Sequence, residues 1–175
     1  MDIIIALGTE EDIDELEQLY NDLNDYLDSH VNYPGWKKEI YPVRENAADG
    51  IKGKYLYTAK DQGKIVGSII LNHHPEPAYQ EAVWQLEAPD SEIIVIHTFV
   101  VHPKYLKCGI GKKLMDFAWD KSVELGMKAV RLDVYEKNLP AISLYEKCGY
   151  RYIGKVDLNL GEYGLDWFKL YEKLV

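Results

Sequence analysis

The stretch Ile93–Val101 constrains this 175-residue chain most, because it is an almost uninterrupted apolar run rich in β-branched side chains. Such a run is typical of a strand that is buried on both faces of a sheet. His102-Pro103 ends the run, since proline has no N–H to donate to a strand ladder. Gly109-Ile110-Gly111 follows after a short turn, and apolar residues then recur at helical spacing up to Gly126. The sequence therefore predicts a strand, a glycine turn and a helix in direct succession.

This arrangement is suited to binding an anion. The first turn of a helix has N–H groups without intrahelical partners and a positive dipole end, and glycines let phosphate oxygens approach the backbone. Two phosphate-binding motifs do not fit. A P-loop would need glycine and a hydroxyl residue where the chain has Leu106 and Lys113, and a dinucleotide fingerprint would need glycine in place of Leu114. A different phosphate-bearing ligand is therefore indicated.

The same segment resembles the acetyl-CoA motif of the GCN5-related N-acetyltransferase (GNAT) family, Gln/Arg-x-x-Gly-x-Gly/Ala after an apolar-x-Val-x-Pro-like strand end. Phe99–Pro103 matches the strand end and Leu106–Gly111 matches the motif, although Leu106 replaces the polar residue. Lys107 or Lys112 can supply the positive charge instead. A second stretch, Asn138–Tyr150, resembles the family's Asn-x-x-Ala-x-x-x-Tyr-x-x-x-Gly-Phe/Tyr signature. The two motifs in this order are far more specific than either one alone.

The rest of the chain reads as further elements of one α+β domain. The predicted strands are residues 3–7, 55–59, 65–72, 93–101, 129–135, 150–156 and 167–171. The predicted helices are residues 10–24, 44–53 and 110–125, with a fourth between Pro140 and Gly149. In the third helix the apolar face is Ile110, Leu114, Phe117, Ala118 and Leu125. Residues 26–36 are expected to be irregular, and residues 73–91 to form a long connection with a helical turn.

The strands at 93–101 and 129–135 are expected to be parallel, because a helix joins them. The GNAT resemblance implies a mixed, mostly antiparallel sheet of about six or seven strands, flanked by about four helices, with the parallel pair at the cofactor site. It also implies a single domain over residues 1–175.

Composition narrows the classes of function. The net charge of −9 argues against a nucleic-acid ligand, which needs a basic footprint, and suits a cationic amine only weakly, because solubility explains it equally well. There is no run of about 18 apolar residues and no basic amino-terminal segment, so we expect neither a membrane span nor a secretory signal. Cys108 and Cys148 show no metal-ligand or disulfide spacing, which favours reduced thiols in a cytoplasm.

The resemblance implies acetyl-CoA as cosubstrate. The backbone of Phe99–Val101 would pair with the pantetheine arm like an added strand, with one amide facing the carbonyl oxygen as it becomes an oxyanion. The amides of Lys107–Lys112 would hold the pyrophosphate. Asn138 would contact CoA, cap its helix, or do both. The cofactor-binding residues implied in this way are Phe99, Val100, Val101, Lys107, Cys108, Gly109, Ile110, Gly111, Lys112, Asn138, Ala141 and Tyr145.

Tyr145 occupies the position of the family's usual general acid, and a phenol suits protonation of a thiolate because its pKa is close to that of an alkyl thiol. Packing in the core is the alternative role for this side chain. Glu92, His97 and His102 are candidate bases on or beside the central strand, where alternation puts His97 and Phe99 on one face. A water chain without a dedicated base is an equal alternative.

The segments that would form the amine pocket, by resemblance, are rich in aromatic residues. They supply Tyr26, His30, Tyr33 and Trp36, with Trp84 facing them. Such rings hold an alkylammonium group by cation–π contact, but packing of helices onto the sheet explains them equally well. No metal is expected, because the adjacent residues His73 and His74 would point to opposite faces of a strand.

Two functions therefore follow from the sequence. The first is an N-acetyltransferase that moves acetyl directly from acetyl-CoA to a primary amine of a small molecule or protein. The alternative is a non-catalytic acyl-CoA-binding sensor or partner module, which Leu106 and the absence of a clear base favour. A homodimer is compatible with either function, and no sequence feature identifies its interface.

Overall fold

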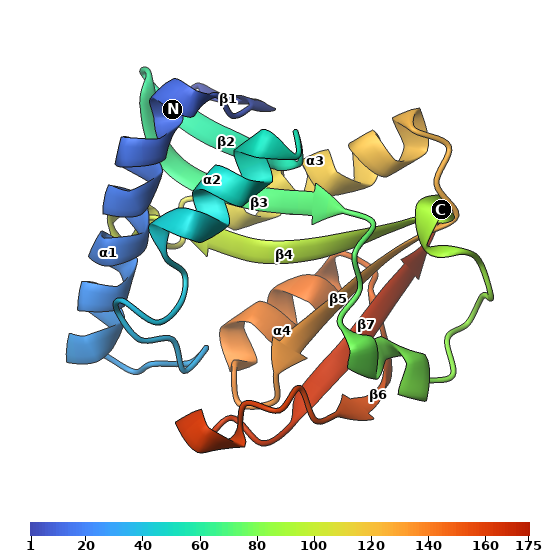
Figure 1. Cartoon of the computed structure of the whole chain (residues 1–175). Helices are drawn as coiled ribbons and strands as arrows, with labels where there is room; N and C mark the ends of the chain where they lie inside the picture. The colour runs from blue at the N-terminus through green and yellow to red at the C-terminus, as the bar shows by residue number, and fades with distance from the viewer. The chain divides into compact units, whose positions relative to one another are not determined.

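The computed structural model describes all 175 residues and shows seven strands and four α-helices (Figure 1). The strands are β1 Ile3–Leu7, β2 Leu56–Asp61, β3 Lys64–Asn72, β4 Ile93–Val101, β5 Ala129–Tyr135, β6 Arg151–Val156 and β7 Phe168–Leu174. The helices are α1 Ile13–Ser29, α2 Arg44–Lys52, α3 Ile110–Glu124 and α4 Leu139–Lys147.

The strands form one sheet in the order β1-β2-β3-β4-β5-β7-β6. The β1–β2, β2–β3, β5–β7 and β6–β7 pairs are antiparallel, whereas β4 and β5 run parallel from Ile93 opposite Ala129 to Val95 opposite Arg131. The predicted α+β class, the mostly antiparallel sheet and the parallel pair are confirmed. The parallel pair follows from α3, which returns the chain to the edge where β4 began.

The chain divides into two compact units. The first comprises residues 1–32, 36–71 and 97–117, and the second comprises residues 33–35, 72–96 and 118–175. Both β4 and α3 contribute residues to each unit. The prediction of a single domain over residues 1–175 stays a prediction.

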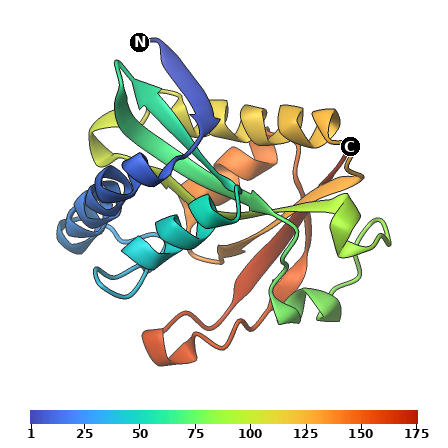
Figure 2. The same ribbon diagram turned by 45° about the horizontal axis from the view of Figure 1, so that its top comes forward.

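In the first unit, α1 and α2 pack on β2 and β3 through a shared apolar core (Figures 1 and 2). The core residues are Leu16, Leu19, Tyr20, Leu23, Leu27, Ala47, Ile51, Leu56, Ile65, Ile70 and Val100. Gly67 on β3 permits the close approach of β4 and α3, because a Cβ there would lie 2.9 Å from the Val100 carbonyl oxygen and 3.0 Å from Leu114. The β2–β3 register shifts beside this glycine, between Ala59 and Lys60, which marks a β-bulge or a similar irregularity.

Helix α1 extends five residues beyond its predicted end at residue 24. Leu23 and Leu27 continue its buried stripe at a spacing of four, and Leu27 is only 6% exposed. The aromatic residue Tyr26 therefore lies in the helix and not in an irregular segment, so that part of the prediction was wrong. The prediction for Leu125 was also wrong, because α3 ends at Glu124 and leaves this side chain 50% exposed.

In the second unit, β5, β7 and β6 pack against the long connection between β3 and β4. The predicted helical turn in this connection is a 3₁₀ helix at Pro77–Glu81, and its Tyr79 joins a core with Ile93, Ala129 and Leu170. A buried ion pair links β5 to β7, with Arg131 Nε 2.7 Å from Glu172 Oε2.

The same connection is held at two further points. Arg131 also donates to the Leu86 carbonyl at 2.6 Å, and the Gln85 N–H donates to Glu172 at 2.8 Å.

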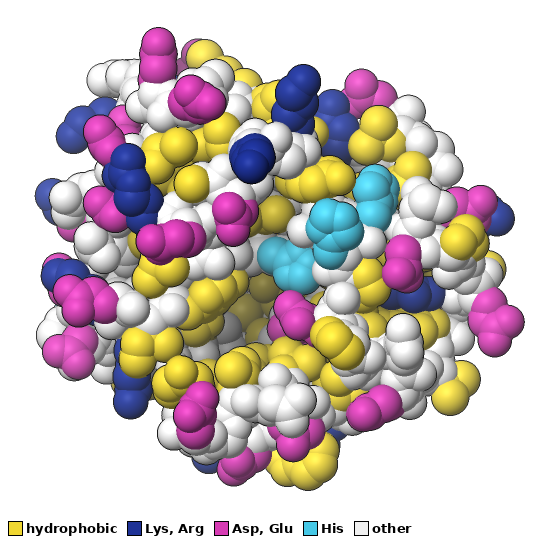
Figure 3. All heavy atoms as spheres, in the orientation of Figure 1, with side chains coloured by type: hydrophobic (Ala, Val, Ile, Leu, Met, Phe, Trp, Pro, Cys, Tyr) yellow, Lys and Arg dark blue, Asp and Glu magenta, His cyan; other side chains and the backbone are white.

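No helix in the structure has the length and apolar character needed to cross a membrane. On the face shown in Figure 3, acidic and basic side chains are interspersed and form no patch of one sign.

Candidate active site

The turn between β4 and α3 has the geometry of an anion-binding site. The His102 N–H donates to the Val66 carbonyl at 2.8 Å and thereby fixes the end of β4. Lys107 and Gly109 then adopt positive φ values of +62° and +83°, and the Lys113 N–H makes a helical bond of 3.1 Å to the Gly109 carbonyl. The N–H groups that come before Lys113 in the first turn of α3 have no intrahelical partner, as at the start of any α-helix.

Gly109 leaves open space in front of this turn. A Cβ built on it meets no atom within 4 Å, and its φ of +83° disfavours any other residue. The turn is therefore accessible to phosphate oxygens and fits a pyrophosphate group through its backbone.

The side chains of the turn contribute less than its backbone. Leu106 is 43% exposed, and the exposed thiol of Cys108 lies 3.6 Å from the Leu106 carbonyl oxygen. Lys112 forms an ion pair of 2.6 Å with Asp116, one helical turn away. Lys107 is exposed at the bend itself. Of the two lysines named from the sequence, Lys107 is therefore better placed to replace the missing polar side chain.

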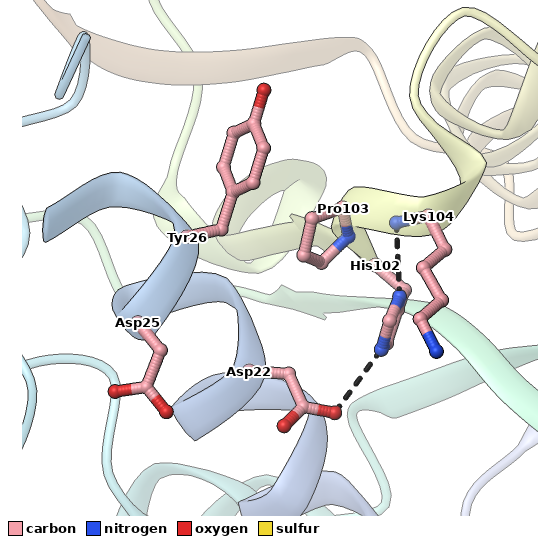
Figure 4. A pocket seen from close by; sticks show the side chains of 6 residues that line it. All are labelled: Asp22, Asp25, Tyr26, His102, Pro103 and Lys104. Atoms are coloured by element: carbon pink, nitrogen blue, oxygen red, sulfur yellow. Dashed lines mark hydrogen bonds and ion pairs between the residues drawn. The ribbon is translucent and has the colours of Figure 1, made fainter. Parts of the chain in front are cut away.

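His102 connects this turn to α1. Its Nε2 lies 3.1 Å from Asp22 Oδ2, and its Nδ1 accepts the Lys104 N–H at 3.1 Å (Figure 4). Because Nδ1 accepts, the neutral ring carries its proton on Nε2 and donates it to Asp22. Neither nitrogen has a lone pair left for a substrate proton, so the structure argues against His102 as the base.

The same contact borders an open hollow of about 410 Å³. Its lining residues are Asp22, Asp25 and Tyr26 from α1 and His102, Pro103 and Lys104 from the turn (Figure 4). Tyr26 stacks on His30 with ring centroids 3.8 Å apart, and Trp36 meets Tyr41 edge-on at 5.3 Å. The sequence named the aromatic residues of this region, but no motif indicated Asp22.

Strand β4 is irregular just before the predicted oxyanion-binding segment. Thr98 has a φ of +46°, and its Oγ1 lies 2.7 Å from the Tyr41 hydroxyl. A β-branched residue rarely adopts this conformation. His97 and Phe99, on either side of the buried Thr98, are nevertheless both half-buried, as strand alternation predicts. The Val100 side chain is 1% exposed and lies in the core, which leaves its backbone for a ligand.

Tyr145 lies on α4 in the second unit, in a cluster of tyrosine rings. Its ring centroid is 6.3 Å from that of Tyr150 and 6.5 Å from that of Tyr171, and it is 6% exposed. Burial raises the pKa of the Tyr150 phenol, with a smaller contribution from Cys148. The Tyr150 hydroxyl oxygen has no hydrogen-bond partner in the structure. Burial also raises the pKa of Tyr171.

Asn138 stands at the N-cap position of α4, but its side chain makes no capping hydrogen bond. Its backbone carbonyl accepts the Ile142 N–H at 3.1 Å, which is the first intrahelical bond of α4. Capping by the side chain, one of the two roles given to Asn138 from the sequence, is therefore wrong. Ala141 is half-buried in the first turn of the helix.

Three residues named from the sequence are already engaged within the second unit or lie at its surface. Glu92 forms an ion pair of 2.9 Å with Lys128. Trp84 donates through Nε1 to the Tyr79 carbonyl at 2.9 Å, and the Arg131 guanidinium lies 4.2 Å from its ring centroid. The cation over Trp84 is thus a residue of this chain, which favours the packing role. Tyr33 is 38% exposed.

A buried tyrosine–carboxylate pair in the same unit was not indicated by the sequence. The Tyr79 hydroxyl donates to Asp133 Oδ2 at 2.7 Å, and Tyr79 is 2% exposed. Burial, together with the negative charge of Asp133, raises the pKa of Tyr79 well above its usual value. No cluster of three or more His, Cys, Asp or Glu side chains is arranged to hold a metal ion.

The motifs and the strand–turn–helix geometry agree with a comparison to known families. A model of the Acetyltransferase (GNAT) family matches residues 16–150. The chain belongs to the GNAT family. It is an N-acetyltransferase, as the two ordered motifs predicted.

Curated relatives carry acetyltransferase names. Streptothricin acetyltransferase of Escherichia coli is 25% identical over 142 residues, which cover 78% of this chain and 72% of the relative. Spermine/spermidine N(1)-acetyltransferase of Bacillus subtilis (strain 168) is 32% identical over 62 residues, covering 35% of this chain and 41% of that relative.

Solved structures show the same fold at low sequence identity. An acetyltransferase of the GNAT family from Streptococcus agalactiae 2603 superposes with a TM-score of 0.76 at 20% identity, covering 99% of this chain and 95% of that one. The ribosomal-protein-S18-alanine N-acetyltransferase of Escherichia coli gives a TM-score of 0.70 at 15% identity, with coverages of 99% and 94%. These similarities establish the fold, whereas the acceptor differs among such proteins.

Proposed function

We propose that this GNAT protein transfers an acetyl group directly from acetyl-CoA to a primary amine. The observation that carries this proposal is the turn after β4, where Gly109 at φ +83° borders open space at the start of α3. Acetyl-CoA carries a pyrophosphate that suits this position, and the family generally uses it. When bound, it supplies the acetyl group as a reactive thioester.

The first unit would hold the cosubstrate mainly through its backbone. The amides of Lys107–Lys112 would bind the pyrophosphate, and the exposed Lys107 would add the charge that Leu106 lacks. The backbone of Phe99–Val101 would pair with the pantetheine arm, because the Val100 side chain is committed to the core. Asn138 and Ala141 are the residues of α4 that we assign to the same ligand.

We assign Tyr145 as the general acid, which donates its phenolic proton to the sulfur of the leaving thiolate. Packing of its ring among Tyr150 and Tyr171 restricts the directions in which its hydroxyl can point. A positioned acid of this kind contributes about 10²–10⁴ to the rate.

We assign His97 as the group that accepts the proton from the attacking ammonium, with a water chain as the alternative. Glu92 and His102 were the other candidates, but Glu92 is ion-paired to Lys128 and both nitrogens of His102 are hydrogen-bonded. A proton must leave before attack, because an amine is mostly ammonium at neutral pH.

For the acceptor we propose a small amine with more than one positive charge. One relative is named for streptothricin and another for spermine and spermidine, which are polycationic amines. In this chain, the stacked Tyr26 and His30 present aromatic faces, and the hollow beside Tyr26 contains the carboxylates of Asp22 and Asp25. Aromatic faces and carboxylates both attract ammonium groups.

Single-turnover acetylation tests this function. The purified protein is mixed with acetyl-CoA and each member of a panel of polyamines, aminoglycosides, amino acids and peptides, and CoA release is followed. We expect release with at least one polyamine, and a tenfold or larger preference for it over amino acids, about the discrimination available from pocket contacts. A protein that binds neither acetyl-CoA nor CoA by calorimetry would contradict the proposal.

A non-catalytic acyl-CoA-binding module is the second candidate. The observation in its favour is the turn, where Leu106 is 43% exposed in place of a polar residue and Lys112 is paired with Asp116. Tight CoA binding without CoA release across the whole panel would select this function. In either case we propose that the protein works in a reducing cytoplasm, since neither Cys108 nor Cys148 is part of a disulfide. A homodimer is tested by its mass in solution.

A further inference from the structure

Thr98 holds an unfavourable backbone conformation inside a strand. Five other non-glycine residues have positive φ, and all of them lie outside the helices and strands, whereas Thr98 lies within β4 and is 7% exposed. A β-branched side chain adds to the steric cost of this conformation. Such a residue persists only where its surroundings hold it in place.

The side chain of Thr98 contacts the Tyr41 hydroxyl, which lies 2.7 Å from Thr98 Oγ1. Tyr41 is itself fixed from several directions. Its carbonyl accepts from Asn24 Nδ2 at 3.1 Å, and Asn24 is a buried residue of α1. Its N–H donates to the Lys37 carbonyl at 3.0 Å, and its ring meets Trp36 edge-on. A rigid phenol therefore meets a strained residue.

We propose that Tyr41 is a positioning residue, whose hydroxyl holds Thr98 at positive φ and thereby sets the direction of the backbone groups of Phe99–Val101. This inference rests on the proposed function, which uses those groups to bind the thioester arm and its carbonyl oxygen. Without the hydroxyl, Thr98 relaxes toward the extended conformation that β-branched residues prefer, and the following peptide groups turn away. A displacement of about 1 Å at such a group costs about 10²-fold in rate.

The test is a double-mutant cycle between Tyr41 and Thr98. Tyr41→Phe removes only the hydroxyl, and we expect it to lower kcat by at least about tenfold through lost alignment of the backbone amides. Its Kd for CoA should rise by a smaller factor than kcat falls, because the turn at Gly109 is untouched and only the contacts of the pantetheine arm with Phe99–Val101 are weakened. Thr98→Gly should stay within about threefold of the wild type, since glycine adopts positive φ without a tether.

The double variant tests whether the Tyr41 hydroxyl acts through Thr98. In the Thr98→Gly background, adding Tyr41→Phe should cost less than about threefold, because glycine no longer needs the hydroxyl. An equal loss in both backgrounds would overturn the inference and assign Tyr41 a direct contact with substrate. If Thr98→Gly folds poorly by thermal melting, Thr98→Asn replaces it, because asparagine also tolerates positive φ.

A readout independent of activity separates this inference from the proposed function. The three-bond HN–Hα coupling of Thr98 reports its φ, and in Tyr41→Phe it should move to the larger value of extended backbone. An unchanged coupling would overturn the inference even if acetyl transfer is observed. A changed coupling in a protein that never releases CoA would support the tether and contradict the proposed function.

Discussion

The turn at Lys107–Gly111 and the tyrosine cluster of α4 meet different chemical demands in different ways. The turn presents backbone groups, and the side chains of Leu106 and Cys108 beside them are exposed. The cluster instead holds one side chain in place. Tyr145 is only 6% exposed, and its ring packs against another tyrosine ring. Under the proposed function, a pyrophosphate needs several N–H donors in a curve, which the backbone would supply, whereas a leaving thiolate needs one proton donor, which Tyr145 would supply. Substitutions should therefore act through conformation in the turn and through chemical identity in the cluster.

The largest effect is expected for Tyr145→Phe, which removes the proton donor and little else. We expect kcat to fall at least tenfold and by about 10² if proton donation is fully rate-limiting, with CoA affinity retained. Tyr150→Phe is the matched control, because it deletes a buried hydroxyl without a partner in the same cluster. It should leave kcat unchanged and not lower the melting temperature. Equal kcat values for the two variants would remove the acid role from Tyr145.

Gly109→Ala should act on cosubstrate binding. The φ of +83° strains any side chain there by about 1–3 kcal/mol, so the turn must rearrange and the Kd for CoA should rise about tenfold by calorimetry. Gly154→Ala is the control, since its Cβ would also meet no atom within 4 Å and its φ is not positive. A Kd unchanged in Gly109→Ala would show that the phosphate groups bind elsewhere.

Three buried tyrosines of the second unit, Tyr79 and the cluster members Tyr150 and Tyr171, should limit stability at alkaline pH. Burial raises the folded-state pKa of Tyr79, Tyr150 and Tyr171 above the ordinary value, so their protons are retained in the folded state after the unfolded chain has lost them. The stabilisation is complete below about pH 10 and declines as the pH rises above it. Urea unfolding between pH 8 and about 11 should show this fall, and Tyr150→Phe should make it shallower.

The smallest effects are expected at the side chains of the turn. Cys108→Ala should change kcat and the Kd for CoA less than about twofold, because direct transfer needs no nucleophilic thiol. Leu106→Gln restores the polar residue of the family motif and should tighten CoA binding by about 0.5–1.5 kcal/mol, the range of one hydrogen bond. A large loss in Cys108→Ala would instead indicate a covalent acyl-cysteine and break the comparison between the two regions.

Elements with strong local signals could be predicted from the sequence. The β-branched run gave strand Ile93–Val101 at its true bounds, and the glycine turn with the apolar spacing after it gave α3. The sequence predicts an end of α1 five residues too early, because the aromatic residues after Asn24 suggest irregular chain, whereas Leu27 continues the buried stripe of the helix. The two motifs identified the family, since both consist of residues close together in sequence.

The sequence by itself determined the sheet's central strand, the glycine turn after it and the GNAT family, because each depends on spacings within one short segment. Only the tertiary structure decided which distant side chains meet. Tyr41 reaches Thr98 across 57 residues, His102 reaches Asp22 across 80, and Tyr79 reaches Asp133 across 54. No local pattern encodes such pairs, because packing of the whole chain brings them together. The same packing holds Thr98 in a conformation that its own residue type disfavours.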